Sequence, residues 1–196
     1  MMTKGRLRGF FGSRSIPIHE LGTSKEIEPE KDGKVLPFEG RPEKLGDKNG
    51  GTYVNKVVVS RKALKYKNGT TNRGNEQMAI KVFPPEYHPS FHKERLNLIL
   101  LKGSSVPPES IQLCFGTVLA NSRGYIISEL ATCDLRHILV GEYIFTSPRV
   151  PPMLLLNEAH SIANGLEWLH RDLVGDGGQL MTGIHMDLKP TNILVF

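Results

Sequence analysis

The stretch HMDLKPTNIL, residues 185–194, places three functional groups on one short segment. Asp187 is followed by Lys189 two positions later and by Asn192 five positions later. Pro190 restricts the backbone between them. A carboxylate can accept a proton, an ammonium can offset the charge of a transferred phosphoryl group, and an amide oxygen can ligate Mg²⁺. The stretch therefore carries the groups that phosphoryl transfer requires.

The pattern His-x-Asp-Leu also occurs earlier, at residues 170–173, in a different setting. Asp172 of this first copy is followed by Val174 and by the polar run GDGG, without a lysine or an amide at matching positions. We expect the first copy to close an amphipathic helix and to lead into a polar surface loop. Only the second copy is a candidate for chemistry.

The stretch at 185–194 resembles the catalytic loop of eukaryotic protein kinases, whose pattern is H-R-D-L-x-x-x-N. Its Lys-Pro pair is the serine/threonine-type form, and Met186 stands where most members have Arg. The resemblance implies that Asp187 and Lys189 are catalytic and that Asn192 ligates a metal. It also implies ATP and Mg²⁺ as cofactors and a protein as the phosphoryl acceptor.

Upstream, the segment AIKVF at 79–83 resembles the third strand of the same family. The resemblance implies that Lys81 holds the α- and β-phosphates of ATP and that Ala79 lines the adenine pocket. Residues 78–83 alternate between two faces, which predicts a short strand. A solvated lysine on an edge strand is the alternative interpretation of Lys81.

A helix is predicted over residues 90–103, with Ser90 as its N-cap and Gly103 at its end. Glu94 lies on an otherwise apolar stripe of this helix, with spacings of 3, 4 and 3 between Phe91, Glu94, Leu98 and Leu101. A buried carboxylate needs a cation, and Lys81 is the candidate, as in the family's lysine–glutamate pair. Alternatively, Glu94 lies at the edge of the stripe and pairs with Lys102 or with water.

The segment YIISELATCDL at 125–135 resembles the family's fifth strand and hinge. The resemblance implies that backbone groups of Glu129 and Ala131 bond the adenine and that Asp134 reaches the ribose. The alternative is a strand that runs into an ordinary turn.

The family's glycine-rich loop, G-x-G-x-x-G, is matched only in part. Gly50 and Gly51 are the residues that the resemblance assigns to the phosphates, while Val54 or Asn55 stands where the third glycine belongs. A simple turn is the alternative interpretation of this glycine pair.

The predicted order of elements is strands, one helix, two strands about a turn at 121–124, and a long helix from Leu155, followed by a loop and an apolar strand. The resulting α+β fold is protein-kinase-like, with an antiparallel N-lobe sheet, one helix and the first part of a helical C-lobe. Residues 1–35 are expected to be a disordered charged tail. Residues 36–128 correspond to the N-lobe and residues 129–196 to the hinge and part of the C-lobe.

Composition bounds the remaining possibilities. The chain has 196 residues, 39% of them hydrophobic, a net charge of +5 and a pI near 9.2. It has no apolar run near the roughly 18 residues of a membrane span. It also lacks the aromatic and basic interleaving of single-strand nucleic-acid binders, so no specific nucleic acid is expected. Two cysteines are consistent with free thiols in a cytoplasmic or nuclear protein, although the basic first 19 residues could instead target mitochondria.

No Asp-Phe-Gly follows the catalytic-loop pattern before Phe196. In the family, the aspartate of that motif holds Mg²⁺. We therefore expect an incomplete kinase domain, weak or inactive as an enzyme. The alternative is a kinase-like remnant that acts as a non-catalytic binding module.

Overall fold

A computed structural model describes most of the chain from Phe38 to the C-terminus. Its described residues form two compact units. Unit 1 comprises the described residues up to Arg95 together with Cys114–Glu129, and unit 2 comprises Leu96–Leu113 and Leu130–Phe196. None of the described helices is long and apolar enough to span a membrane. The described ranges are 38–49, 51–60, 75–104, 107–120, 122–143, 152–175 and 177–196; Gly50, the Asn68-Gly69 turn and the N-terminal tail lie outside them.

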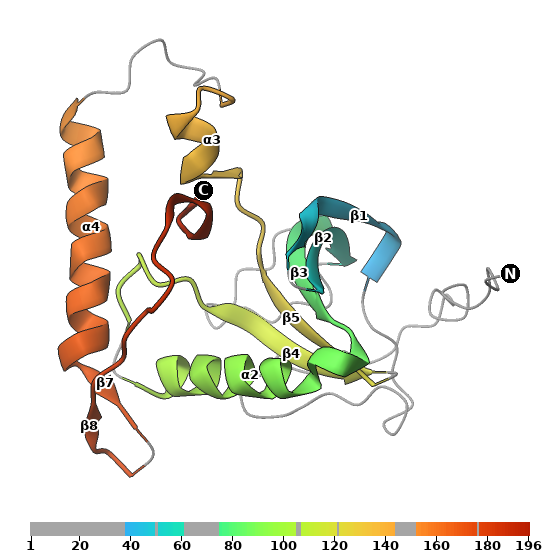
Figure 1. Cartoon of the computed structure of the whole chain (residues 1–196), viewed down its shortest axis with the longest axis horizontal. Helices are drawn as coiled ribbons and strands as arrows, with labels where there is room; N and C mark the ends of the chain where they lie inside the picture. Colours follow the sequence, from blue (N-terminus) through green and yellow to red (C-terminus); the bar gives the residue numbers. More distant parts are fainter. Residues whose placement is uncertain are drawn as a thin grey trace, which may run out of the picture. The chain divides into compact units, whose positions relative to one another are not determined.

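Unit 1 is built on a five-stranded antiparallel sheet with the strand order β1-β2-β3-β5-β4 (Figure 1). Consecutive strands are neighbours in this sheet except β3 and β4, because β5 lies between them. The mixed α+β class expected from the sequence is therefore present. The strands are β1 (Phe38–Asn49), β2 (Thr52–Ser60), β3 (Asn75–Phe83), β4 (Cys114–Ala120) and β5 (Arg123–Glu129).

β3 is the central strand, and its two faces are both packed. Met78, Ile80 and Val82 are buried in the main apolar cluster of the sheet. On the other face, the buried Phe83 ring packs against Phe91 with a centroid distance of 5.6 Å. Burial of these side chains removes apolar surface from water, which stabilises the sheet and its contact with the following helix. Lys81 shares the second face and is therefore directed toward that helix.

β3 also begins earlier than the sequence predicts. The alternation predicts the strand only from residue 78, yet residues 75–77 pair with 58–60 of β2. Backbone pairing with a neighbouring strand does not depend on apolar side chains, so the ladder continues past the apolar segment. The strand ends at Phe83 as expected, because Pro84 and Pro85 follow.

β1 is a strand that composition did not indicate. It contains Gly40 and Pro42, and its register with β2 shifts between Glu39 and Glu43. Gly40 has a φ of +74°, which a glycine adopts without strain. An edge strand tolerates proline and such an irregularity, because only one of its sides needs a regular ladder.

A single turn of 3-10 helix, η3 (Pro85–Tyr87), leads directly into α2 (His88–Gly103). The expected N-cap at Ser90 is wrong, because the helix begins two residues earlier and Ser90 lies in its first turn. Proline is tolerated in a first helical turn, where its missing N–H has no partner to lose, so Pro89 does not delay the start.

Unit 2 contains the long helix α4 and several short pairings. β6 pairs with β9 near the C-terminus, and β7 pairs with β8 directly after α4. The polar segment after Arg171, expected to be a plain surface loop, thus contains a small antiparallel pairing. The elements are β6 (Cys133–Asp134), α3 (Leu135–Leu139), α4 (Pro152–Arg171), β7 (Leu173–Val174), β8 (Leu180–Met181), η4 (Pro190–Asn192) and β9 (Leu194–Val195).

α4 begins three residues before the expected Leu155, with Pro152 in its first position. Burial is uneven along α4. Leu155 is 54% exposed, whereas Gly165 and Trp168 near the other end are buried. Gly165 has no side chain, and the Ser110 side chain packs against its backbone, so this side of the helix is the covered one.

Candidate functional site

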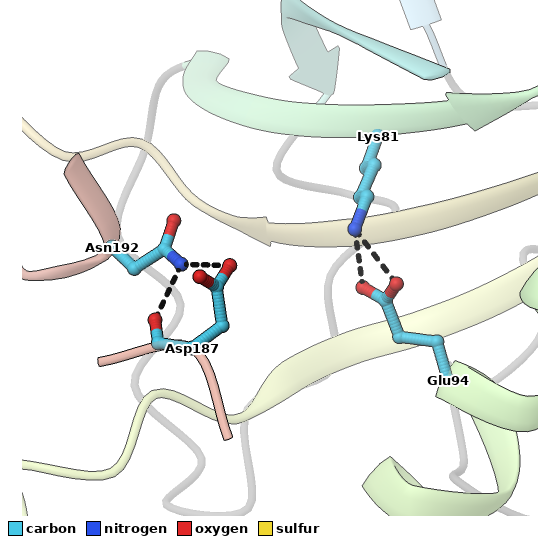
Figure 2. Close-up of polar contacts among 4 residues, drawn as sticks. All are labelled: Lys81, Glu94, Asp187 and Asn192. Atoms are coloured by element: carbon cyan, nitrogen blue, oxygen red, sulfur yellow. Dashed lines mark hydrogen bonds and ion pairs between the residues drawn. The ribbon is translucent and has the colours of Figure 1, made fainter. Parts of the chain in front are cut away.

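Lys81 and Glu94 form the ion pair that the sequence predicted. The Lys81 ammonium donates to both carboxylate oxygens of Glu94, at 2.7 and 2.9 Å (Figure 2). The two side chains are 36% and 38% exposed, so the pair is only partly shielded from water. The ammonium also lies 5.0 Å from the centre of the Phe83 ring, a cation–π distance. The carboxylate thus holds the lysine in one position on the face of the sheet.

The register of the sheet defines the neighbours of Lys81 and Ala79 on the adjacent strands. Lys81 lies between Val54 of β2 and Ile126 of β5. Ala79, two residues earlier, is half-buried and lies between Lys56 and Ser128. The small side chain of Ala79 leaves space beside the lysine on the same face of β3.

Gly51 lies in the turn that joins β1 to β2. Asn49 and Thr52 are opposite each other in the ladder, and Gly51 has a φ of +89°, a conformation that side chains disfavour. A Cβ built on Gly51 would overlap the ring of Tyr87. The glycine therefore allows the backbone to turn tightly and to lie close to the Tyr87 ring. Its predicted partner Gly50 lies outside the described residues.

The backbone of the segment around Asp187 is tightly folded. The Asp187 N–H donates to the carbonyl of His185 at 2.7 Å, which closes a three-residue turn about Met186. Met186 has a φ of +58°, a left-handed conformation that is costly for a side chain of this size. Pro190 then begins η4, in which the Asn192 N–H donates to the Lys189 carbonyl at 2.9 Å.

These turns bring the three predicted side chains together. The Asn192 amide donates to the Asp187 carboxylate and to its backbone carbonyl, each at 2.8 Å (Figure 2). The Lys189 ammonium lies 2.9 Å from the same carboxylate. The hydrogen bond from Lys189, then that from Asn192, lowers the pKa of Asp187 below its usual value. Because its pKa is lowered and its side chain is exposed, Asp187 is an ionised carboxylate that solvent can reach.

The bonds of Asn192 bear on its predicted role as a metal ligand. Its amide nitrogen is used within the loop, which leaves the amide oxygen as the atom that can ligate a cation. The described residues contain no group of three or more histidine, cysteine, aspartate or glutamate side chains arranged to hold a metal. Asp187 and Asn192 offer a carboxylate and an amide oxygen, which suit Mg²⁺ rather than a softer metal.

The segment after β5 is fastened to the C-terminal strand. Thr132 N–H donates to the Val195 carbonyl at 2.7 Å, and Leu135 N–H donates to the Ile193 carbonyl at 2.8 Å. These bonds run on either side of the β6–β9 pairing. Glu129 is the last residue of β5, and Ala131 directly precedes Thr132 in the chain.

Asp134 has a structural partner that accounts for its position. Its carboxylate caps α3 by accepting from the His137 N–H at 3.1 Å, and it lies 2.7 Å from the His137 imidazole. Burial raises the pKa of Asp134, but the hydrogen bonds from His137 outweigh burial and leave the pKa lowered. Contact of Asp134 with a ribose stays a prediction, and any such contact would use a carboxylate already engaged in the cap.

Sequence reasoning missed two features of these sites. Tyr87 contacts the glycine turn although it lies 36 residues away in sequence, and no local pattern announces such a contact. The turn about Met186 was also missed, since methionine is not a residue that signals a left-handed backbone. The cap at Asp134 could have been found, because an aspartate directly before a helix is a common N-cap.

Comparison with models of known protein families gives no match for this chain, and comparison with curated proteins gives none either.

Proposed function

We propose that this protein is a kinase-like domain that binds Mg·ATP and transfers its γ-phosphoryl group to serine or threonine hydroxyls of proteins. The observation that carries the proposal is the ion pair between Lys81 and Glu94. The two alternatives, a solvated Lys81 on an edge strand and a Glu94 that pairs with Lys102 or water, both predict no such contact. A lysine held in this way presents a fixed positive charge to the phosphates of a nucleotide.

The segment around Asp187 supports the second half of the proposal. Its carboxylate is ionised and exposed, so it can accept the proton of an attacking hydroxyl. Lys189 lies beside it and would offset charge on the transferred group, while the Asn192 amide oxygen would ligate Mg²⁺. The γ-phosphorus–oxygen bond to ADP breaks, a bond to the substrate oxygen forms, and the substrate proton goes to Asp187.

The sheet of unit 1 is compatible with the N-lobe of a protein kinase. It has five antiparallel strands, and the lysine lies on the central one. A single helix supplies the glutamate. In this proposal Ala79 would line the adenine site, and backbone groups near Glu129 and Ala131 would bond the adenine.

The test is transfer of labelled phosphate from Mg·ATP to a serine/threonine peptide mixture under single-turnover conditions. We expect slow but measurable transfer by the wild type. Asp187→Asn should abolish it, and Asp172→Asn, the matched change in the first His-x-Asp-Leu copy, should not. Equal transfer by wild type and Asp187→Asn would contradict the catalytic proposal.

A non-catalytic binding module is the second candidate, and one observation favours it. Every large hydrophobic side chain that is exposed among the described residues belongs to unit 2. At the start of α4, four consecutive residues are 46–65% exposed, namely Met153, Leu154, Leu155 and Leu156. Apolar side chains gathered in this way are typical of surfaces that contact another protein. If neither the wild type nor Lys81→Met binds Mg·ATP, only this second function remains.

A further inference from the structure

One face of the segment from η3 into α2 meets the sheet at three points. Tyr87, Phe91 and Glu94 are spaced by four and three residues, which places them on one side of a helix. The Tyr87 ring lies against Gly51, the Phe91 ring lies against Gly124, and the Glu94 carboxylate holds Lys81. Two of these contacts are aromatic rings seated on glycines, where any Cβ on the sheet would collide with them.

The contact at Gly51 is the one that involves a turn rather than a strand interior. Carbon atoms at the far edge of the Tyr87 ring and its hydroxyl oxygen are the atoms that a Cβ on Gly51 would meet. Tyr87 itself is fixed, because its N–H donates to the Pro84 carbonyl at 2.9 Å and η3 leads without a break into α2. The ring therefore lies against the backbone of the β1–β2 turn from a segment whose own backbone is hydrogen-bonded.

A hairpin turn that carries glycine has many accessible backbone conformations, and fixing one of them costs conformational entropy. The Tyr87 ring restricts the turn before any ligand arrives. The same short segment carries Glu94 seven residues later, so the turn and the Lys81–Glu94 pair are supported by one helix.

We infer that Tyr87 is a positioning residue that holds the Gly51 turn in place for the phosphates of a bound nucleotide. The inference rests on the proposed function, because that function assigns the turn to the phosphates. It deepens the proposal by naming the side chain that pre-orders this turn, and it predicts that the effect of Tyr87 depends on the phosphates of the ligand.

The experiment uses the full chain with Tyr87→Ala, Tyr87→Phe and, as a matched neighbour on the same turn of helix, the exposed Glu86→Ala. Affinities for Mg·ATP and for adenosine are measured by calorimetry. Hydrogen exchange at the backbone amides of Gly51–Tyr53 is followed without nucleotide, and exchange within β3 serves as the control for global unfolding.

We expect Tyr87→Ala to weaken Mg·ATP binding about tenfold, which corresponds to losing the pre-ordering of roughly one residue. Adenosine affinity should stay within about twofold of wild type. Exchange at the turn should accelerate by a similar factor, and exchange in β3 should not change. Tyr87→Phe keeps the ring and should behave as wild type, as should Glu86→Ala. A merely structural role would weaken adenosine and Mg·ATP alike.

A second variant, at Gly51 on the other side of the contact, tests the inference even if Tyr87→Ala folds poorly. Gly51→Ala pushes the ring away, and its effect on Mg·ATP affinity should be smaller in the Tyr87→Ala background than in wild type. Additive effects of the two changes would overturn the inference.

The remaining outcomes separate this inference from the function on which it rests. Unchanged exchange at Gly51–Tyr53 in Tyr87→Ala, in a chain that does bind Mg·ATP, overturns the inference alone. Faster exchange at the turn, in a chain whose wild type binds no Mg·ATP, overturns the phosphate assignment of the turn together with the proposed function.

Discussion

The ammonium of Lys81, on the central strand of the sheet, donates to both carboxylate oxygens of Glu94, in the second turn of α2. Both side chains remain more than one third exposed. Water therefore screens the attraction, and a pair of this kind stabilises a fold by only about 0–1 kcal/mol. Under the proposed function, its geometry, with one lysine held by two oxygens, would matter more for binding the nucleotide than for folding.

Glu94→Gln should therefore separate stability from ligand binding. We expect its thermal unfolding to differ from wild type by no more than about 1 kcal/mol. Because the lysine loses its charged anchor, Mg·ATP affinity should fall by roughly tenfold or more. Calorimetric unfolding and calorimetric titration measure the two quantities on the same samples.

Glu43→Gln is the matched control for that change. Glu43 pairs with Lys56 at 2.5 Å between the neighbouring strands β1 and β2, and its side chain is 63% exposed. We expect this variant to keep wild-type Mg·ATP affinity. An equal loss of affinity in the two variants would show that the Lys81–Glu94 pair has no special part in binding.

Gly124→Ala should destabilise unit 1, because the added methyl group would collide with the buried Phe91 ring. Overpacking of this kind costs about 1–3 kcal/mol. Gly103→Ala at the end of α2 is the control, since nothing lies within 4 Å of its added Cβ. Chemical denaturation should show a lowered midpoint for Gly124→Ala only; equal midpoints would mean that Phe91 does not rest on Gly124 in solution.

Lys189→Met should move the titration of Asp187 to higher pH. The hydrogen bond from Lys189 is the largest cause of the lowered pKa, so its removal returns the pKa toward the ordinary value near 3.9. A carboxyl group with a lowered pKa is still ionised at the pH where an ordinary carboxyl group begins to protonate. It is protonated only when the pH falls through its own, lower pKa. The acid limb of the pH–rate profile should shift upward accordingly.

The carboxyl carbon shift of Asp187, followed by NMR between about pH 2 and 6, measures this titration directly. Arg171→Met, within the first His-x-Asp-Leu copy, removes a cation whose partner is Glu167 and should leave the midpoint of Asp187 unchanged. A midpoint that stays in place in Lys189→Met would contradict the described contact between Lys189 and Asp187.

Asp134→Ala should loosen α3 by removing its N-cap, at a cost of about 1 kcal/mol. Asp134→Asn keeps an oxygen that can accept from the His137 N–H and should lose much less. Hydrogen exchange of the His137 amide distinguishes the two variants. Equal protection of that amide in Asp134→Ala and wild type would show that the cap does not hold the helix.

The sequence predicted the elements in which local pattern and tertiary packing agree. The alternation over 78–83 marks β3, because its two faces are packed against different partners. The spacing of Phe91 and Glu94 placed the carboxylate on the side of the helix that meets Lys81. The second His-x-Asp-Leu copy indicated that Asp187, Lys189 and Asn192 lie together, since five residues about a proline leave little freedom.

The remainder depended on contacts that are distant in sequence. β1 is held by its pairing with β2 despite Gly40 and Pro42, so strand propensity gave no indication of it. The exposed Leu155 belongs to the same apolar pattern as the covered end of α4, and the pattern alone does not reveal which end packs. Tyr87 follows β3 and Gly51 precedes β2, so their contact depends on how these two strands pair and not on a local pattern.

The most direct test of the central claim follows Lys81 and Asp187 in one titration. The full chain, labelled at the lysine ammonium nitrogens and aspartate carboxyl carbons, is titrated with Mg·ATP and observed by NMR. If the two side chains serve the same nucleotide, both signals will shift with a single dissociation constant, and the Asp187 response will require Mg²⁺. A Lys81 signal that saturates while Asp187 does not move, or a titration in which neither moves, would contradict the proposal.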